Sequence, residues 1–142
     1  MKINRKGSAS WSGGLKEGKG TISTESGALS AQPYGFAMRF EGVKGTNPEE
    51  LIGAAHAGCF TMALSNILGQ ANLTATKMDT TATVTLEQGG GGFAITAINL
   101  KLEAAVPGAT QEQFAELAKK AKENCPVSKL LKADITLDAK LV

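Results

Sequence analysis

One long apolar segment, residues 46–69, constrains the fold more than any other part of the chain. It reads TNPEELIGAAHAGCFTMALSNILG and carries no charged side chain after Glu50. Asn47 can cap a helix, Pro48 suits its first position, and Glu49 and Glu50 place negative charge in its first turn. Glu50 also stands three residues after Asn47, as in a capping box. Because no face of this helix is polar, we expect it to be buried on nearly all sides.

A membrane-spanning helix is the alternative for this segment, since about 20 residues can cross a bilayer. The run is built from Ala and Gly rather than from Leu and Ile, and it carries His56, Ser65 and Asn66. We therefore interpret it as the central helix of a soluble core. The N-terminal MKINRKGS contains charge without a following apolar run, so no signal peptide is predicted and a cytoplasmic location is expected.

Shorter elements flank the central helix. Alternation and turn residues predict strands over 2–7, 9–12, 20–24 and 35–41 before it, and over 78–86, 93–106 and 134–142 after it. The four glycines at 89–92 indicate a hairpin, and a slip in the apolar phase suggests either a β-bulge near Ala97 or a twist that changes the buried face. A helix over 111–123 is capped by Thr110 and stopped by a left-handed Asn124, and a second helix covers 126–132.

Strands and helices are segregated in this order, which indicates an α+β fold with a mostly antiparallel sheet around the long buried helix. With 142 residues, the chain fits a single domain over 1–142. Its net charge of +2 is spread along the sequence and its aromatic content is 5%. Nucleic-acid binding would require a basic face or a stacking surface, so neither nucleic acid nor a membrane is an expected partner.

The chain has two cysteines, Cys59 and Cys125, which lie 66 residues apart. A stable structural disulfide is disfavoured in a reducing cytosol, so the pair consists either of bystanders or of redox-active thiols. One histidine and no CxxC motif exclude an ordinary zinc site. Cys125 precedes Pro126 at a helix start, where the dipole favours a thiolate. Cys59 lies in mid-helix among apolar residues, so it becomes reactive only if a fixed cation reaches it.

Arg39 is the candidate for that cation. The alternating segment GFAMRFE predicts a strand with Arg39 opposite Phe36, Met38 and Phe40, and its guanidinium stays charged at cellular pH. Glu49 is its candidate partner, although a solvated ion pair of little worth is the alternative. Glu49 and Cys59 are separated by about 15 Å along one helix. If both serve one site, Glu49 comes from a second subunit, and a homodimer is expected.

His56 and several aromatic residues are weaker candidates for functional roles. His56 lies on the same side of the helix as Cys59, three positions earlier. No signature of a thiol hydrolase accompanies it, so a core or interface histidine with satisfied hydrogen bonds is favoured over a Cys–His nucleophile. An apolar substrate pocket could be walled by several of the aromatic residues, namely Trp11, Tyr34, Phe36, Phe40, Phe60 and Phe93.

The segment RFEGVKGTNPEELIGAAHAGCF, followed downstream by ENCPVSKLLKADITL, resembles the osmotically inducible protein C / organic hydroperoxide resistance (OsmC/Ohr) family. GKGTISTESG and AQPYGF extend the similarity to the osmotically inducible protein C branch over nearly the whole chain. The resemblance implies a thiol-dependent peroxidase of α+β fold that works as an intertwined homodimer with two sites at the subunit interface.

Carried over to this sequence, the resemblance makes Cys59 the peroxidatic cysteine and Cys125 the resolving cysteine, joined as a disulfide after turnover. Arg39 would hold the thiolate and polarise the peroxide, and Glu49 would orient Arg39. The implied substrates are organic hydroperoxides and, more weakly, hydrogen peroxide. No cofactor is implied beyond an external thiol or dithiol reductant, with dihydrolipoyl groups as the family's suggestion. An oxidant-sensing thiol switch and a non-catalytic binder of apolar ligands at a dimer interface are the alternatives.

Overall fold

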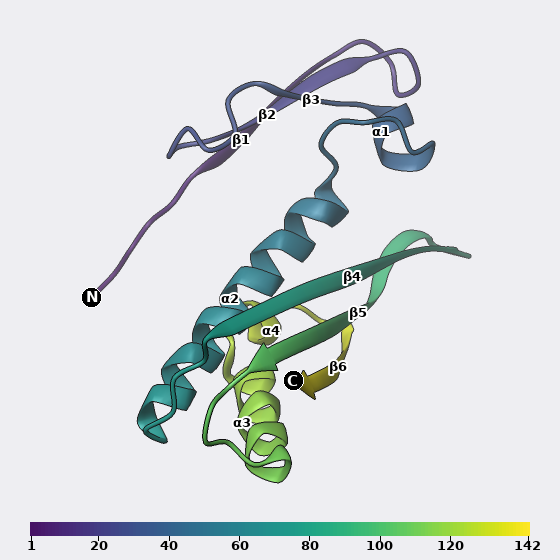
Figure 1. Ribbon diagram of the computed structural model, residues 1–142. Coiled ribbons are helices and arrows are strands. Elements are labelled where there is room, and N and C mark those ends of the chain that lie inside the picture. Colours follow the sequence, from purple (N-terminus) through teal and green to yellow (C-terminus); the bar gives the residue numbers. More distant parts are fainter. The chain divides into compact units, whose positions relative to one another are not determined.

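The computed structural model describes residues 1–142 and has a mixed α+β fold with two sheets and four helices (Figure 1). The chain divides into two compact units, Met1–Leu51 and Ile52–Val142, and the division falls within the first turn of the longest helix. The elements follow in the order β1 (Gly7–Ser12), β2 (Lys19–Thr24), β3 (Gln32–Tyr34), α1 (Phe36–Phe40), α2 (Pro48–Gln70), β4 (Lys77–Gly89), β5 (Gly92–Ala105), α3 (Gln111–Asn124), α4 (Pro126–Leu130) and β6 (Asp134–Leu141).

The first unit contains an antiparallel sheet in the order β1-β2-β3. Gly20 on β2 pairs with Trp11 on one side and with Tyr34 on the other. A Cβ at Gly20 would lie only 2.3 Å from the Tyr34 ring and 2.7 Å from the Trp11 ring. The glycine therefore lets the two rings meet above β2, where their centroids are 5.3 Å apart. Pro33 lies in the edge strand β3, which is where a residue without an N–H can be accommodated.

The strand predicted over 35–41 is wrong, because these residues form the single-turn helix α1. The Arg39 N–H donates to the Gly35 carbonyl at 3.1 Å and the Glu41 N–H donates to the Ala37 carbonyl at 2.9 Å. A short apolar run fits either period, and here the helical spacing places the Phe36 and Phe40 rings 4.9 Å apart. Arg39 was predicted to lie on the opposite side of a strand from these rings. It lies instead on a helix, one residue before Phe40.

The second unit contains the sheet β4-β5-β6. β4 and β5 form the predicted hairpin, closed by the glycine turn. The predicted β-bulge is confirmed, because Thr85 pairs with Ala97 while Leu86 pairs with Ile95, which leaves Thr96 without an opposite residue. β6 runs parallel to β5, so three of the four strand pairings in the two sheets are antiparallel.

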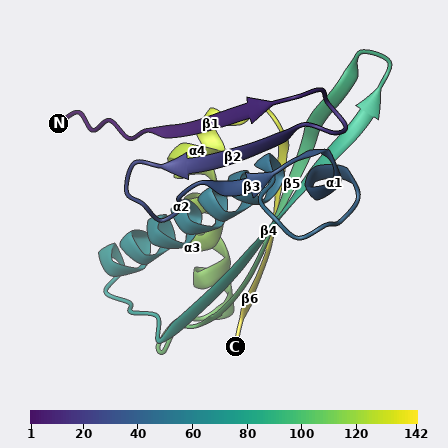
Figure 2. The same cartoon turned by 90° about the horizontal axis from the view of Figure 1, so that it is seen from above.

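The core of the second unit lies between helices α2 and α3 and one face of the sheet, and Figure 2 shows both helices on the same side of β4. The alternation predicted for β4 is confirmed, since every second residue from Met78 to Leu86 is turned away from solvent. The most deeply buried apolar side chains are Phe60, Leu64 and Leu68 of α2, Ile98, Leu100 and Leu102 of β5, and Phe114, Ala118 and Ala121 of α3.

Helix α2 begins and ends as its sequence indicates, but a single chain covers only one of its faces. Its buried residues follow a helical stripe, and Met62 on another face is 77% exposed. The expected burial on nearly all sides is therefore not met within one chain. By length and composition α2 is apolar enough to cross a membrane, with a mean hydropathy of 1.4 in its most apolar window. The buried stripe consists of Gly53, His56, Phe60, Leu64, Ile67 and Leu68.

The ends of helix α3 test two capping predictions. The Thr110 hydroxyl accepts a hydrogen bond from the Gln113 N–H, so the predicted cap of α3 is confirmed. Asn124 does not take the predicted left-handed conformation, because α3 continues through it and ends at Cys125 with a φ of −58°. The left-handed asparagine is instead Asn72, with a φ of 58°, directly after α2.

Gly53 lets α2 approach strand β4 closely, and we therefore expect a larger side chain at this position to lower stability. A Cβ at Gly53 would lie 3.1 Å from the Ala82 carbonyl oxygen and 3.4 Å from a Val84 methyl, whereas a Cβ at Gly69 meets nothing within 4 Å. We expect Gly69→Ala to stabilise the protein by about 0.5–1 kcal/mol through helix propensity. Gly53→Ala should instead destabilise it by about 1 kcal/mol, because overpacking outweighs that gain. Urea unfolding of both variants checks this, and equal stabilisation by both would contradict the close approach.

Candidate functional site

The two cysteines meet within the second unit. Cys59 lies in the middle of α2 and is partly buried, and Cys125 lies between α3 and α4 and is fully buried. The Cys125 thiol donates a hydrogen bond to Cys59 Sγ, with 2.9 Å between the two sulfurs, and both thiols are free. A disulfide requires about 2.05 Å between sulfurs. The two sulfurs therefore need to move only slightly closer for a disulfide to form, although the two cysteines are far apart in the sequence.

The local sequence places Cys125 at the junction of two helices. Its N–H donates to the Ala121 carbonyl at 2.9 Å and so ends α3, while its carbonyl accepts from the Lys129 N–H at 3.1 Å and so begins α4. Pro126 occupies the first turn of α4, as predicted, because a residue without an N–H is tolerated there. The chain turns sharply at this point, and Cys125 is directed to the buried side of the junction.

Three local influences act on the Cys59 thiol. Burial raises the pKa of Cys59 by disfavouring the thiolate, and the neighbouring Cys125 thiol raises this pKa further. The backbone N–H of Val127 acts in the opposite direction and lowers the pKa of Cys59. Burial is the largest of these influences, so the net shift is upward. None of the three is a positive charge, and the second unit by itself leaves Cys59 mostly as a thiol at neutral pH.

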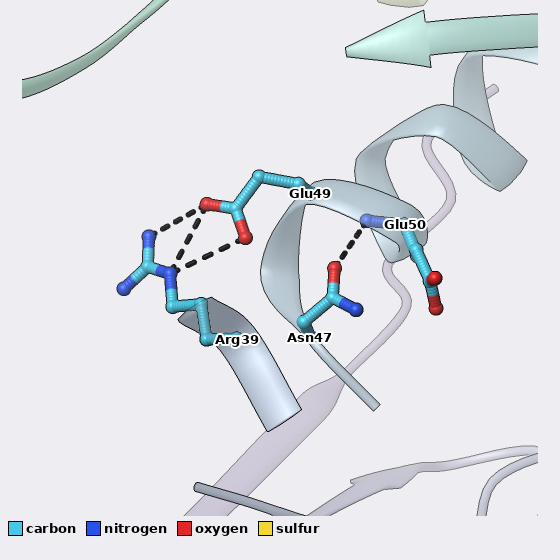
Figure 3. A network of polar contacts seen from close by, with 4 residues as sticks. All are labelled: Arg39, Asn47, Glu49 and Glu50. Atoms are coloured by element: carbon cyan, nitrogen blue, oxygen red, sulfur yellow. Dashed lines mark hydrogen bonds and ion pairs between the residues drawn. The ribbon is translucent and has the colours of Figure 1, made fainter. Parts of the chain in front are cut away.

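Arg39 and Glu49 form an ion pair within the first unit. Arg39 Nη2 donates to Glu49 Oε1 at 2.7 Å, and Arg39 Nε lies 3.2 Å from both carboxylate oxygens. Figure 3 shows the guanidinium and the carboxylate facing each other, with the second terminal nitrogen of Arg39 turned away. The Arg39 side chain is 37% exposed and the Glu49 side chain 13% exposed. The carboxylate therefore fixes the guanidinium in orientation and leaves part of it accessible.

Capping and ring contacts support this pair on both sides. The Glu50 N–H donates to Asn47 Oδ1 at 2.8 Å, which confirms Asn47 as the cap of α2 and places Glu49 in the first turn (Figure 3). On the α1 side, the Arg39 guanidinium lies over the Phe40 ring, 5.4 Å from its centroid. A cation stacked on a ring and held by a forked carboxylate has little freedom to rotate.

An aromatic cavity of about 200 Å³ borders Arg39 in the first unit. Of the six aromatic residues considered for a substrate wall, Phe60 is instead a core residue and Phe93 lies in the β4–β5 hairpin, 55% exposed. The other four line the cavity. Its full lining consists of Trp11, Leu15, Tyr34, Gly35, Phe36, Arg39 and Phe40.

His56 is fully buried and its Nε2 lies 2.8 Å from Ser128 Oγ on α4. Its Nδ1 is buried without a hydrogen-bond partner. Burial lowers the pKa of His56, so the imidazole is neutral at physiological pH. The predicted burial of His56 in the core is confirmed, but the prediction that its hydrogen bonds are satisfied is wrong at Nδ1. No hydrogen bond joins His56 to Cys59. No group of three or more His, Cys, Asp or Glu side chains in the structure is arranged to hold a metal ion.

Two contacts were missed in the sequence, that of the Val127 amide with Cys59 and that of the Ser128 hydroxyl with His56. Both groups follow directly from the segment CPVS. The first N–H groups of any helix lack partners inside it, so a helix that starts at Pro126 offers the Val127 N–H to a neighbour. Which neighbour receives it depends on the packing of α4 against α2 and is not encoded locally.

Comparisons with known proteins agree on one family. Residues 41–140 match the family model described as OsmC-like protein. The chain is 62% identical to the Peroxiredoxin OsmC of Escherichia coli (strain K12) over 99% of both sequences. The fold resembles the crystal structure of the organic hydroperoxide resistance protein OhrB of Bacillus subtilis, with a TM-score of 0.70, 27% identity and 99% and 98% of the two chains covered. It also resembles an organic hydroperoxide resistance protein OsmC from Legionella pneumophila, with a TM-score of 0.72, 27% identity and 99% and 100% covered.

The buried imidazole generates a prediction about stability and pH. Because the pKa of His56 is lowered in the folded state, the unfolded chain binds the proton more readily below about pH 6.5. Folding stability should therefore fall as the pH drops through this range, by at most about 1.4 kcal/mol per pH unit. His56→Gln keeps a side chain that reaches Ser128 and does not titrate, so its stability should fall less between about pH 7.5 and 5.5. Urea unfolding at both pH values checks this, and identical slopes would contradict a neutral buried imidazole.

Proposed function

The chain belongs to the OsmC-like protein family, and on this basis we propose that it is a cysteine-based peroxidase that reduces organic hydroperoxides. The observation that supports this most strongly is the approach of Cys59 and Cys125 to 2.9 Å as free thiols. Relatives named as a peroxiredoxin and as organic hydroperoxide resistance proteins carry the same function class. A thiol pair at this distance, with one member accessible and the other buried, suits oxidation followed by disulfide formation.

The chemistry begins with attack of the Cys59 thiolate on the outer oxygen of the hydroperoxide. The S–O bond forms as the O–O bond breaks, so the sulfur becomes a sulfenic acid and the peroxide leaves as an alcohol after taking up a proton. The Cys125 sulfur then attacks the sulfenic sulfur, which forms the Cys59–Cys125 disulfide and releases water with the thiol proton. An external dithiol restores both thiols by exchange and is itself oxidised.

Arg39 supplies the positive charge that the first step needs. Burial raises the pKa of Cys59, so a permanent cation is required to favour its thiolate at neutral pH. Arg39 is suited to this role because it cannot lose its proton and because Glu49 holds it with a forked set of hydrogen bonds. The terminal nitrogen that faces away from Glu49 offers donors for the thiolate and for the peroxide oxygens (Figure 3). Glu49 thus acts as a positioning residue.

The aromatic cavity beside Arg39 supports organic hydroperoxides over hydrogen peroxide as the substrates. Its walls are ring faces and apolar side chains, and Arg39 is the only charged residue among them. The organic group of a hydroperoxide can therefore be buried there with a gain in free energy that hydrogen peroxide cannot provide. No cofactor takes part, and the reductant is a thiol or dithiol such as a dihydrolipoyl group.

A homodimer explains the apolar face of α2 that one chain leaves uncovered. A hollow of about 530 Å³ lies on this face, and small residues of α2 form much of its lining. Glu49 and Cys59 are separated by about 15 Å along α2, so a second copy that brings its own Arg39–Glu49 pair satisfies the chemistry better than one chain does. Residues 1–142 act as a single OsmC-like domain in this dimer, and the cytoplasm is the expected location. The hollow is lined by Ala57, Gly58, Thr61, Met62, Ser65, Met78 and Thr80.

The cysteine roles predict two distinct losses of activity. Cys59→Ser should consume no peroxide, because no sulfur remains to be oxidised at that position. Cys125→Ser should consume about one equivalent and then stop, because its sulfenic acid has no resolving thiol. The measurement is steady-state removal of cumene hydroperoxide, tert-butyl hydroperoxide and hydrogen peroxide with a dithiol. Absence of consumption by the unmodified protein would favour the apolar-ligand binder, and oxidation without recycling would favour the thiol switch.

The arginine role predicts a loss of rate without a loss of fold. Arg39→Ala should lower kcat/KM for cumene hydroperoxide by about 100-fold or more, because it removes a positioned positive charge from a site with little water. Arg39→Lys should recover only part of this, since an ammonium lacks the fork that pairs with Glu49. Arg5→Ala removes the only other arginine of the chain and is the control, with activity unchanged. Near-normal turnover in Arg39→Ala would refute the role.

A further inference from the structure

The contact between the buried His56 and the partly buried Ser128 repeats the geometry of the cysteine pair one helical turn away. His56 precedes Cys59 by three residues on α2, and Ser128 follows Cys125 by three residues at the start of α4. The sulfurs are 2.9 Å apart, and His56 Nε2 is 2.8 Å from Ser128 Oγ. Helices α2 and α4 are therefore joined by two neighbouring polar contacts, of which only the first takes part in the proposed chemistry.

Helix α4 depends on contacts of this kind for its position. It has five residues and none of them is fully buried, so apolar burial fixes it only weakly. Val127 and Leu131 pack against the edge of the core, while Leu130 is 76% exposed. A directional hydrogen bond to a fully buried side chain of α2 constrains both the distance and the rotation of such a short helix.

The imidazole is suited to hold this helix because it has no competing partner. Its Nδ1 is buried and unpaired, so the contact of Nε2 with Ser128 is its only hydrogen bond. Burial also lowers the pKa of His56 and keeps the ring neutral. A buried polar group whose single partner is removed becomes costly, which strongly favours the arrangement in which Ser128 stays in place. A side chain needed only to fill the core would not require the polar ring.

Two groups that act on Cys59 are carried by the segment that this contact holds. One is the backbone N–H of Val127, which lowers the pKa of Cys59, and the other is the Cys125 thiol, which donates to the Cys59 sulfur. They flank Pro126, and both lie within three residues of Ser128. Any movement of α4 away from α2 therefore affects the first step, through the amide, and the second step, through the thiol.

We propose that His56 and Ser128 form a clamp that positions α4, so that the Val127 amide and the Cys125 thiol both reach Cys59. The effect of the clamp on catalysis rests on the proposed function, whereas the contact between His56 and Ser128 is present in the reduced protein. When Cys125 is held close, it intercepts the Cys59 sulfenic acid. When it is not, a second hydroperoxide oxidises the sulfenic acid to a sulfinic acid and leaves as the alcohol, and the enzyme is inactivated. The clamp thus sets the competition between resolution and overoxidation.

The first test is independent of peroxidase activity. In a Cys125→Ser background, where Cys59 is the only thiol, the rate of Cys59 alkylation by iodoacetamide is measured against pH with and without Ser128→Ala. The clamp predicts a profile displaced to higher pH in the double variant, with a rate at about pH 7.5 that is lower by about threefold to tenfold, because the amide no longer supports the thiolate. Ser128→Thr keeps a hydroxyl and should restore the original profile. Superimposed profiles for Ser128→Ala and its background would overturn the clamp.

The second test follows the disulfide in the protein with both cysteines. After one equivalent of cumene hydroperoxide, rapid-quench trapping of the sulfenic acid with dimedone gives the rate of disulfide formation. Ser128→Ala should form the disulfide about tenfold more slowly and accumulate more sulfinic acid per turnover, while Ser128→Thr and His56→Gln behave as the unmodified protein. Resolution at the normal rate in Ser128→Ala would overturn the clamp alone. Failure of the unmodified protein to form any disulfide would instead overturn the proposed function.

Discussion

The desolvation of Cys59 is the constraint on which the functional architecture depends. A thiol in the middle of a long helix receives nothing from the helix dipole, and burial raises its pKa. The same burial creates the dry surroundings in which a positive charge or a backbone N–H acts strongly. In the proposed mechanism, the Val127 amide and the Arg39 guanidinium offset the cost of ionising this one sulfur.

In the proposed mechanism, the two compact units contribute different parts of the chemistry. The second unit supplies the thiol pair, with its buried core of helices and sheet and a short helix α4 placed by the clamp. The first unit supplies an oriented cation and an aromatic cavity, beside a small sheet whose strand β1 is exposed throughout. Because a reactive thiolate needs both contributions, the proposed dimer and the proposed peroxidase activity are two consequences of one electrostatic requirement.

The segment CPVS has several structural roles within four residues. It ends one helix, starts another, and presents a thiol, an amide and a hydroxyl. A short helix can shift when the sulfurs move from hydrogen-bonding distance to a covalent bond, which a long packed helix such as α2 cannot do without disturbing the core. The proposed clamp restrains that freedom with a histidine whose lowered pKa keeps it neutral at physiological pH.

The sequence alone was sufficient for the features that depend on local patterns. The cap and start of α2, the β4–β5 hairpin with its bulge, the cap of α3 and the start of α4 all follow from neighbouring residues, because capping groups and side-chain periodicity act over a few positions. The family resemblance added the candidate roles of both cysteines, Arg39 and Glu49. The local patterns failed at residues 35–41, where a short apolar run fitted both a strand and a helix.

Only the tertiary structure decided which distant groups meet. The 2.9 Å separation of the sulfurs, the Val127 amide on Cys59 and the contact between His56 and Ser128 join segments about 70 residues apart, and no local pattern specifies such a pairing. The parallel pairing of β6 with β5 and the uncovered face of α2 were likewise fixed by packing. The sequence determines which chemical groups are present and how each short segment folds, whereas the free energy of burying them together determines which of them become neighbours.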